Sequence, residues 1–306
     1  MHIAETTYQK LTRLISNLAG IELPQHCEKR LVNRIAKRLN AVNVDSLERY
    51  YEYVAADEGG TERQALIEAV TTHYTSFFRD IGQFAHVREE LKTLLLNGQH
   101  KLRIWSAACS SGEEPYSLAI TALEATRLAG VKSPDIRILA TDISRQILQD
   151  ASEGWFPLSS LQKLTVLQRN YFEPIRKRCE ITGEPMLRVN KQLRDLVIFR
   201  RVNLCDRPLQ VPSAIDVIFC RNVLLYFNPR QQQSILDSLT SRLNSGGLLY
   251  VGASEQVRGF LPQMTPERAC VFRKTSNAQA STLTPAPWSA PFDCANHAPN
   301  VRQRTI

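Results

Sequence analysis

Residues 103–119 read RIWSAACSSGEEPYSLA, a pattern that changes from apolar run to loop to helix-like sequence within seventeen residues. The apolar run Ile104–Cys109 predicts a buried strand, Ser110–Gly112 predict a tight loop, and the residues after them predict a helix. Strand, loop and helix in this order often bind a nucleotide. A phosphate-binding loop is rich in glycine, whereas this loop has one glycine and leads into Glu113 and Glu114. The pattern therefore indicates a nucleotide-like ligand that favours negative charge at this place.

The chain continues this alternation of strand and helix from about residue 90. The predicted strands are KLRIWSAA (101–108), DIRILATDI (135–143), LVIFRRVNL (196–204), AIDVIFCRNVLLYF (214–227), GGLLYVGAS (246–254) and ACVFRK (269–274). The predicted helices between them are 113–129, 145–154 and 229–244. Short apolar strands with intervening helices predict an α/β protein with a parallel, doubly wound sheet, covered on both faces and binding its ligand at the carboxyl ends of the strands.

Three other segments differ from this alternation. Residues 173–196 alternate in short pieces around Thr182-Gly183, which predicts a small antiparallel β insert. Residues 276–306 are rich in proline and poor in residues that could form a core, so we expect a disordered tail. The N-terminal segment predicts helices only, at 7–20, 28–42, 46–56 and 61–72.

One of these helices has two distinct stripes. Leu31, Ile35, Leu39 and Val42 share an apolar face, and a basic face adjoins it. The basic residues are Arg30, Arg34, Lys37 and Arg38. Such a stripe is either an ordinary solvated surface or a surface that binds an acidic partner.

Composition excludes several classes of protein. The 306 residues suggest about two domains, and no window is long and apolar enough for a membrane span. The N-terminus lacks the order of a signal peptide, so we expect a cytoplasmic protein without membrane insertion. The seven cysteines form no CxxC pair, so neither disulfides nor a metal site is expected. The net charge of +8 is spread along the chain, and residues 1–72 hold nine Lys/Arg against ten Asp/Glu.

Two acidic residues, Asp142 and Glu114, limit further the class of ligand that the site can bind. The chain has no GxGxxG after its first strand, and Asp142 ends the next strand, where a carboxylate can accept both ribose hydroxyls. Glu114 would favour a cation and repel a pyrophosphate. S-adenosylmethionine has a ribose, a sulfonium and an ammonium, and fits both residues. The alternative, that Glu113 and Glu114 merely suit the first turn of a helix, stays open for either residue alone.

The motifs together resemble a known family. WSAACSSGEEPYSLA, ATDIS, FRRVNL, DVIFCRNVLLYF, GGLLYVGASE and, upstream, TTHYTSFFRD look like the CheR-type chemotaxis-receptor methyltransferases over about residues 5–274. The resemblance implies a class I S-adenosylmethionine-dependent methyltransferase fold with an all-α N-terminal domain. The expected boundaries are 1–75 for the helical receptor-docking domain, 76–90 for a linker segment, 91–275 for the methyltransferase domain and 276–306 for the tail.

The resemblance also implies roles for residues of the linker segment. His73, Thr75 and Arg79 match positions that contact the cofactor, with Arg79 near its methionine carboxylate and the reaction centre. His73 stands where the family usually has asparagine, and a neutral imidazole keeps one donor and one acceptor. The alternative, that His73 only packs in the linker, stays open.

The remaining cofactor positions follow the strands. Glu114 matches the carboxylate for the ammonium group and Asp142 the ribose ligand. The contacts on the adenine side and after the fourth strand match Asn203, Leu204, Arg221 and Asn222. Tyr226 matches an aromatic hydroxyl near the methyl group, and we expect it to act with Arg79 as an orienting catalytic residue.

The implied reaction transfers a methyl group to glutamate side chains of chemoreceptors and yields S-adenosylhomocysteine. A glutamate is ionised at neutral pH, so positioning rather than acid–base chemistry should dominate. The implied partners are the acidic methylation helices of receptors, which Arg34, Lys37 and Arg38 would bind, and we expect a monomer that binds no nucleic acid. Two alternatives remain: a nucleic-acid methyltransferase, suggested by the basic charge, and a cofactor-binding scaffold without turnover.

Overall fold

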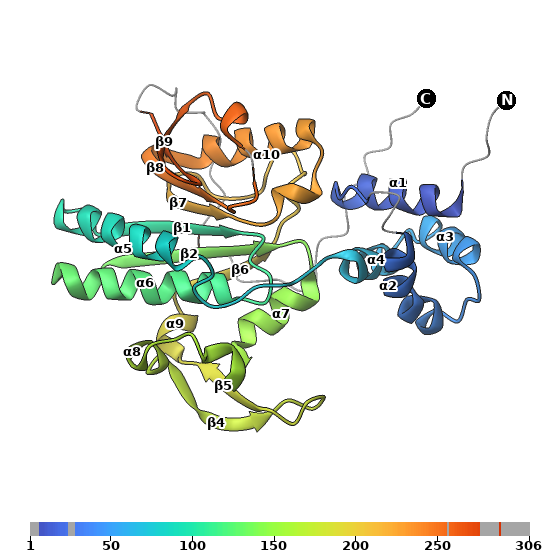
Figure 1. Ribbon diagram of the computed structural model, residues 1–306, viewed down its shortest axis with the longest axis horizontal. Coiled ribbons are helices and arrows are strands. Elements are labelled where there is room, and N and C mark those ends of the chain that lie inside the picture. The colour runs from blue at the N-terminus through green and yellow to red at the C-terminus, as the bar shows by residue number, and fades with distance from the viewer. Residues whose placement is uncertain (1–5, 24–27, 256, 276–287, 289–306) are drawn as a thin grey trace. The chain divides into compact units, whose positions relative to one another are not determined.

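The computed structural model describes residues 6–23, 28–255, 257–275 and 288 (Figure 1). These residues divide into two compact units. The helical unit contains the described residues up to Thr72 together with Tyr226–Asn228, and the α/β unit contains His73–Leu225 and the described residues from Pro229 onward. The predicted tail, 276–306, lies outside the described residues except for Trp288.

The helical unit has four helices among its described residues, close to the predicted ranges. They are α1 (Thr7–Ala19), α2 (Glu28–Ala41), α3 (Leu47–Ala55) and α4 (Thr61–Val70). Thr6 begins α1 with a capping box, which satisfies backbone N–H groups of the first turn. On α2 the predicted apolar face is buried at Leu31 and Ile35 and half-buried at Leu39, and Val42 just beyond the helix is also half-buried. Helix α2 packs against α4.

The α/β unit contains a seven-stranded sheet with the order β6-β2-β1-β7-β8-β10-β9. The strands are β1 (Lys101–Ala107), β2 (Asp135–Asp142), β6 (Val197–Arg201), β7 (Ile215–Cys220), β8 (Leu243–Val251), β9 (Met264–Arg268) and β10 (Val271–Lys274). The first five strands in this order are parallel, whereas β10 runs antiparallel to β8 and β9. The sheet is therefore mixed rather than wholly parallel. Strand β9 was not predicted, because four of its five residues are exposed.

Helices cover both faces of this sheet, as predicted. They are α5 (Ile81–Leu96), α6 (Glu113–Ala129), α7 (Arg145–Glu153) and α10 (Pro229–Arg242), with 3₁₀ turns η3 (Leu224–Tyr226) and η4 (Arg258–Phe260). The connections β1-α6-β2 and β7-α10-β8 run in opposite directions across the sheet, so right-handed crossovers put α6 and α10 on opposite faces. Helix α5, which begins within the expected linker 76–90, lies beside α6 (Figure 1).

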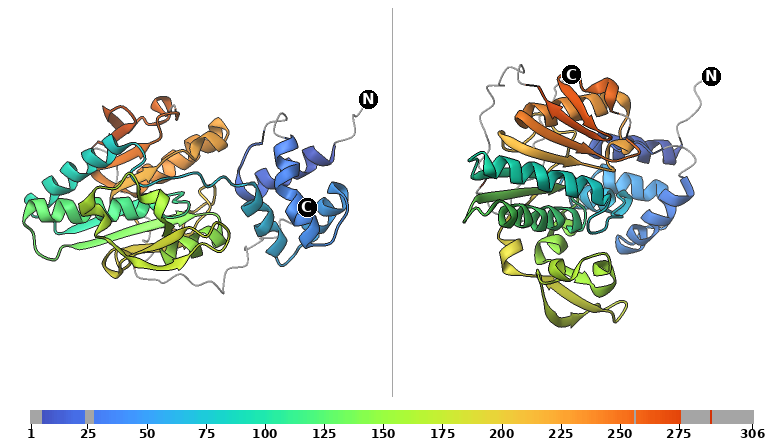
Figure 2. Two further views of the ribbon diagram at one scale, coloured as in Figure 1. Left: turned by 60° about the horizontal axis from the view of Figure 1, so that its bottom comes forward. Right: turned by 60° about the vertical axis from the view of Figure 1, so that its left-hand side comes forward.

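The small antiparallel sheet is larger than expected. It has three strands in the order β3-β5-β4, namely β3 (Trp155–Pro157), β5 (Pro185–Val189) and β4 (Phe172–Arg178) (Figure 2). Short helices accompany it, at η2 (Leu158–Leu161), α8 (Val166–Arg169) and α9 (Lys191–Arg194). The sheet thus begins at Trp155 instead of near residue 173. Phe156 packs edge-on against Phe77 and Tyr116, which joins the insert to the α/β unit.

No helix in the described part of the chain is both long and apolar enough to cross a membrane.

Candidate active site

The carboxyl ends of four adjacent strands bring most of the predicted cofactor residues to one edge of the α/β unit. Strands β6, β2, β1 and β7 are neighbours and parallel, and the strand order reverses between β1 and β7, because β2 follows on one side and β8 on the other. This switch point is where open α/β sheets bind ligands. The residues at or just after these four ends are Glu114, Asp142, Asn203, Leu204, Arg221 and Asn222.

The loop after β1 is compact because its backbone takes unusual conformations. Ala108, Ser110 and Gly112 all have positive φ, at 65°, 52° and 100°. A Cβ atom on Gly112 would lie 3.0 Å from the Cβ of Ala151, so both the conformation and the space favour glycine. The Cys109 N–H donates to the carbonyl of Thr141 over 2.8 Å. The loop is thereby held against the end of β2.

Asp142 fastens three segments at this edge. Its Oδ2 accepts the N–H of Ser110 at 2.9 Å, its Oδ1 accepts the N–H of Ser144 at 3.1 Å, and its carbonyl accepts the N–H of Val202 at 2.9 Å. The side chain is buried. A carboxylate has about four acceptor sites, so about two remain for ribose hydroxyls. The Ser110 hydroxyl is also buried and has no partner among the described residues, which fits a polar ligand at this loop.

Glu114 offers a half-buried negative charge beside the loop that Asp142 holds. Its Oε1 accepts the hydroxyl of Ser106 at 2.7 Å, and its Oε2 lies 3.4 Å from Nη1 of Arg221. Burial raises the pKa of Glu114, while Arg221 opposes that shift. A bound ammonium would compensate the half-buried carboxylate further, so these residues fit the amino-acid end of S-adenosylmethionine.

The Arg221 guanidinium is engaged mainly by the protein. Its Nη2 donates to the carbonyl of Arg79 at 2.8 Å and to Oδ2 of Asp80 at 2.5 Å. The group also lies over the rings of Phe84 and Phe219, at 5.7 and 5.6 Å from their centroids. Arg221 therefore ties the segment that carries Arg79 to the end of β7.

That segment has a constrained backbone. Phe78 and Asp80, on either side of Arg79, both have positive φ, at 51° and 60°. The Phe78 N–H donates to the hydroxyl of Ser117 on α6 at 3.0 Å. Arg79 itself donates to the carbonyl of Tyr74 at 3.2 Å. These contacts fix the position of Arg79 in the α/β unit.

Two of the predicted cofactor-binding residues, His73 and Thr75, precede the segment that carries Arg79. His73 and Thr75 lie on irregular chain between Thr71 and Ser76, and both are half-buried. Their contacts to the cofactor stay predictions.

The loop after β7 depends on a residue that sequence reasoning left out. Glu255 accepts the N–H groups of Val223 and Leu224 through Oε1, both at 2.8 Å, and that of Gly252 through Oε2 at 2.6 Å. Asn222 has a φ of 58° and approaches Gly252 so closely that a Cβ there would lie 2.8 Å from its Nδ2. Ser106 and Asp80 were missed as well. Glu255 and Asp80 end the quoted motifs GGLLYVGASE and TTHYTSFFRD, so proximity to these motifs was the available signal.

Tyr226 belongs to the helical unit. Its carbonyl accepts the N–H of Glu22 at 2.8 Å, and Asn228 donates to the Glu22 carboxylate at 3.2 Å. Its role near the methyl group stays a prediction.

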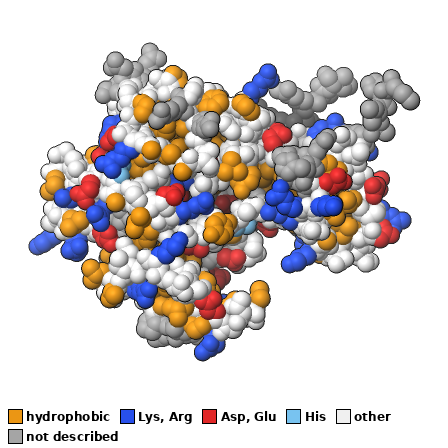
Figure 3. Space-filling view, in the orientation of Figure 1, with side chains coloured by type: hydrophobic (Ala, Val, Ile, Leu, Met, Phe, Trp, Pro, Cys, Tyr) orange, Lys and Arg blue, Asp and Glu red, His pale blue; other side chains and the backbone are white. Residues whose placement is uncertain are grey.

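The basic stripe of α2 is not uniformly available to a partner. Arg38 pairs with Glu62 through two hydrogen bonds, of 3.0 and 2.5 Å, and the Tyr50 hydroxyl donates to the same carboxylate at 2.8 Å. Arg34 donates to the carbonyl of Val70 and to the hydroxyl of Thr72. Lys37, the third of the predicted receptor-binding residues, is exposed and makes no ion pair with another described residue. Basic and acidic side chains are interspersed on the face drawn in Figure 3.

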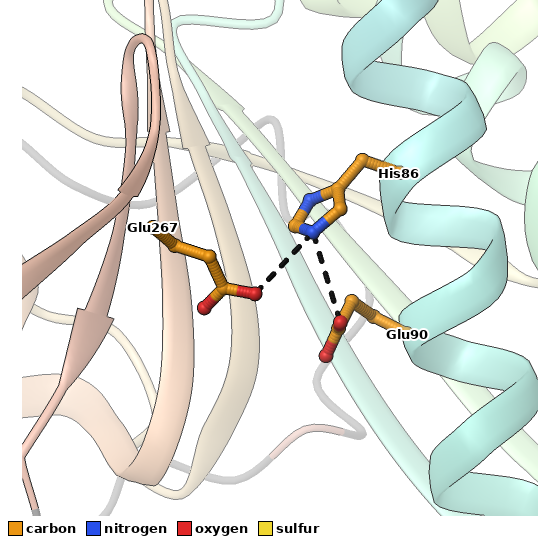
Figure 4. Close-up of side chains that lie close together, drawn as sticks. All are labelled: His86, Glu90 and Glu267. Atoms are coloured by element: carbon orange, nitrogen blue, oxygen red, sulfur yellow. Dashed lines mark ion pairs between the residues drawn. The ribbon is translucent and has the colours of Figure 1, made fainter.

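One cluster away from this edge has the side chains of a metal site. His86 on α5 lies 3.7 Å from a Glu90 oxygen and 3.4 Å from a Glu267 oxygen (Figure 4). Arg273, however, pairs with both carboxylates, and the Tyr250 hydroxyl lies 2.8 Å from Nδ1 of His86. The guanidinium compensates the charge that would attract a cation, so the cluster is better explained as a structural link between α5 and the antiparallel strands.

Comparison with known proteins identifies the family. The family model "CheR methyltransferase, all-alpha domain" matches residues 6–71, and "CheR methyltransferase, SAM binding domain" matches residues 73–269. The chemotaxis protein methyltransferase of Salmonella typhimurium (strain LT2) is 36% identical over 254 residues, which are 83% of this chain and 84% of that protein. Chemotaxis protein methyltransferase 2 of Pseudomonas aeruginosa (strain PAO1) is 33% identical over 258 residues, 83% of this chain and 88% of that protein.

Among solved structures, the N-methyltransferase NodS from Bradyrhizobium japonicum, in complex with S-adenosyl-l-homocysteine, has a TM-score of 0.35 and 13% identity over 62% of this chain and 86% of that one. The family matches confirm the resemblance and S-adenosylmethionine as the cofactor. The chain belongs to the CheR methyltransferase family.

Proposed function

We propose that this S-adenosylmethionine-dependent methyltransferase of chemotaxis methylates glutamate side chains of chemoreceptors and forms their γ-methyl esters. The observation that carries the proposal is the pair of carboxylates at the switch point, the buried Asp142 and the half-buried Glu114, each with acceptor capacity left over. This pair suits a ligand with a ribose and an ammonium and does not suit a dinucleotide. The proposal includes the roles in cofactor binding and catalysis that the family motifs imply for the site residues.

The chemistry asked of the protein is positioning. S-adenosylmethionine supplies an activated methyl group on its sulfonium. A receptor glutamate is already ionised at neutral pH, so the chain needs no base to remove a proton. Asp142 holds the ribose and Glu114 the ammonium, while Arg79 and Tyr226 orient the reacting groups. Holding two reactants in line can contribute roughly 7–11 kcal/mol to lowering the barrier.

The proposed partner is an acidic methylation helix of a chemoreceptor, met by a monomer of this chain in the cytoplasm. Of the three basic residues assigned to this contact, Arg34 and Arg38 already bind groups of the helical unit, so their side chains would bind a receptor only in addition to those contacts. Lys37 is exposed and can meet a carboxylate without such competition. We therefore place the largest share of receptor attraction on Lys37.

The experiment is methyl transfer from labelled S-adenosylmethionine to receptor-rich membranes and, separately, to total RNA. The proposal expects label in receptor protein that alkali releases as methanol, because a carboxyl ester is base-labile. Label in RNA would favour the nucleic-acid alternative. Tight cofactor binding with no transfer to either preparation would favour the scaffold.

A further inference from the structure

Arg221 stands between two carboxylates and is shared unequally. Its Nη2 lies 2.5 Å from Oδ2 of Asp80, whereas its Nη1 lies 3.4 Å from Oε2 of Glu114. The Arg221 side chain is 1% exposed and that of Glu114 13%. The shorter contact is thus with Asp80, and the contact with Glu114 is long for an ion pair of ideal geometry.

The charges of these three groups do not cancel. One guanidinium between two carboxylates leaves one formal negative charge. Arg79 and Glu255 also act on Glu114, but their charges are of opposite sign and leave this balance unchanged, so a single ammonium would neutralise it. Without Asp80, the guanidinium would neutralise Glu114 by itself and nothing would remain for a ligand cation. An arginine beside the carboxylate that should bind the ammonium is otherwise difficult to explain, because like charges repel at short range.

We propose that Asp80 is a positioning residue that holds Arg221 and so keeps the negative charge of Glu114 available to the ammonium group of the cofactor. The inference rests on the proposed role of Glu114. It assigns to Asp80 an effect on cofactor affinity that acts through Arg221, without contact between Asp80 and the cofactor.

The backbone conformation at Asp80 allows a substitution that removes the charge and little else. Asp80 has a φ of 60°, a conformation that asparagine tolerates well among residues other than glycine. Asp80→Asn therefore keeps the backbone and one oxygen acceptor for Arg221, and removes only the charge. A second pair offers a matched control. Arg103 and Asp135 are also 2.5 Å apart, with side chains 8% and 50% exposed against 1% and 46% for Arg221 and Asp80. Asp135 begins β2, whereas the site lies where that strand ends.

The test measures the dissociation constants of two adenosine ligands by calorimetry. Decarboxylated S-adenosylhomocysteine carries the amine but no carboxylate, so Arg79 cannot obscure the effect. Methylthioadenosine lacks both groups and reports on the adenosine pocket and on folding. We expect Asp80→Asn to weaken the amine ligand about tenfold and methylthioadenosine by less than about twofold. Asp135→Asn should change neither.

Glu114→Gln, measured alongside, separates the inference from the proposed site. If Glu114→Gln weakens the amine ligand selectively and Asp80→Asn does not, the role of Asp80 is refuted while the ammonium site stands. If Glu114→Gln has no selective effect, the ammonium site is wrong and the inference fails with it. Equal weakening of both ligands by Asp80→Asn, or an effect of Asp135→Asn of the same size, would show a merely structural role.

Discussion

Replacing Asp142 by alanine should lower both the affinity for the cofactor and the free energy of unfolding, and the two effects can be measured separately. The carboxylate accepts the N–H groups of Ser110 and Ser144, and alanine leaves both without an acceptor. An unsatisfied buried N–H costs about 1–3 kcal/mol, so the free energy of unfolding should fall by about 2–6 kcal/mol, toward the lower end if water enters the space. Lost hydrogen bonds to a ribose should cost a further 1.5–3 kcal/mol or about 10- to 150-fold in affinity.

The assay is calorimetric titration of the folded variant with S-adenosylmethionine and with S-adenosylhomocysteine. Both dissociation constants should rise by the same factor, because the ribose is common to both ligands. Asp216→Ala is the matched control. Asp216 is 7% exposed, as Asp142 is, and accepts the N–H of Arg103 at 2.8 Å, but it lies at the start of β7 rather than at the site. It should lower stability and leave both affinities unchanged. An unchanged affinity in Asp142→Ala, or equal losses in the two variants, would refute the ribose assignment.

Three further predictions concern catalysis, docking and pH. Tyr226→Phe should lower kcat and leave the cofactor dissociation constant near wild type, and equal losses in both would indicate a structural role. Lys37→Gln should raise the receptor KM and reduce its salt dependence without loss of stability, whereas Arg38→Gln should lower the free energy of unfolding by about 1–3 kcal/mol, because Glu62 loses its ion pair; urea titration of both variants checks this difference. Burial raises the pKa of Glu114, and its ionised form binds the ammonium, so affinity for S-adenosylhomocysteine should fall as pH falls from neutral through the raised pKa of this carboxyl group. The same titration of Glu114→Gln should be nearly flat, and an equal slope would contradict this cause.

Sequence patterns predicted local structure well where residues close in the sequence determine it. Helix α6 begins at Glu113 as predicted, because Gly112, with its positive φ, is the N-cap residue at the end of the loop. Helix α5 was missed although Phe84, Val87, Leu91 and Leu95 lie at helical spacing and are buried. The motif TTHYTSFFRD ends at Asp80, directly before this helix.

Long-range pairing could not be predicted in the same way. Arg38 and Glu62 are 24 residues apart, and nothing in the local pattern distinguishes Arg38 from Lys37. Only the packing of α2 against α4 makes one of them a structural residue. Trp155 likewise joins the small sheet through a strand that forms more than thirty residues away, where Arg188 is its register partner.

The chemical identity of the reaction product shows most directly whether the chain methylates glutamate side chains. A receptor cytoplasmic fragment, incubated with S-adenosylmethionine and wild-type enzyme, would be digested and its peptides sequenced by mass spectrometry, with Asp142→Ala enzyme as control. We expect one added methyl group on glutamate side chains, lost after mild alkali and absent or greatly reduced with the variant. Methylation at nitrogen atoms, or methyl groups that survive alkali, would contradict it.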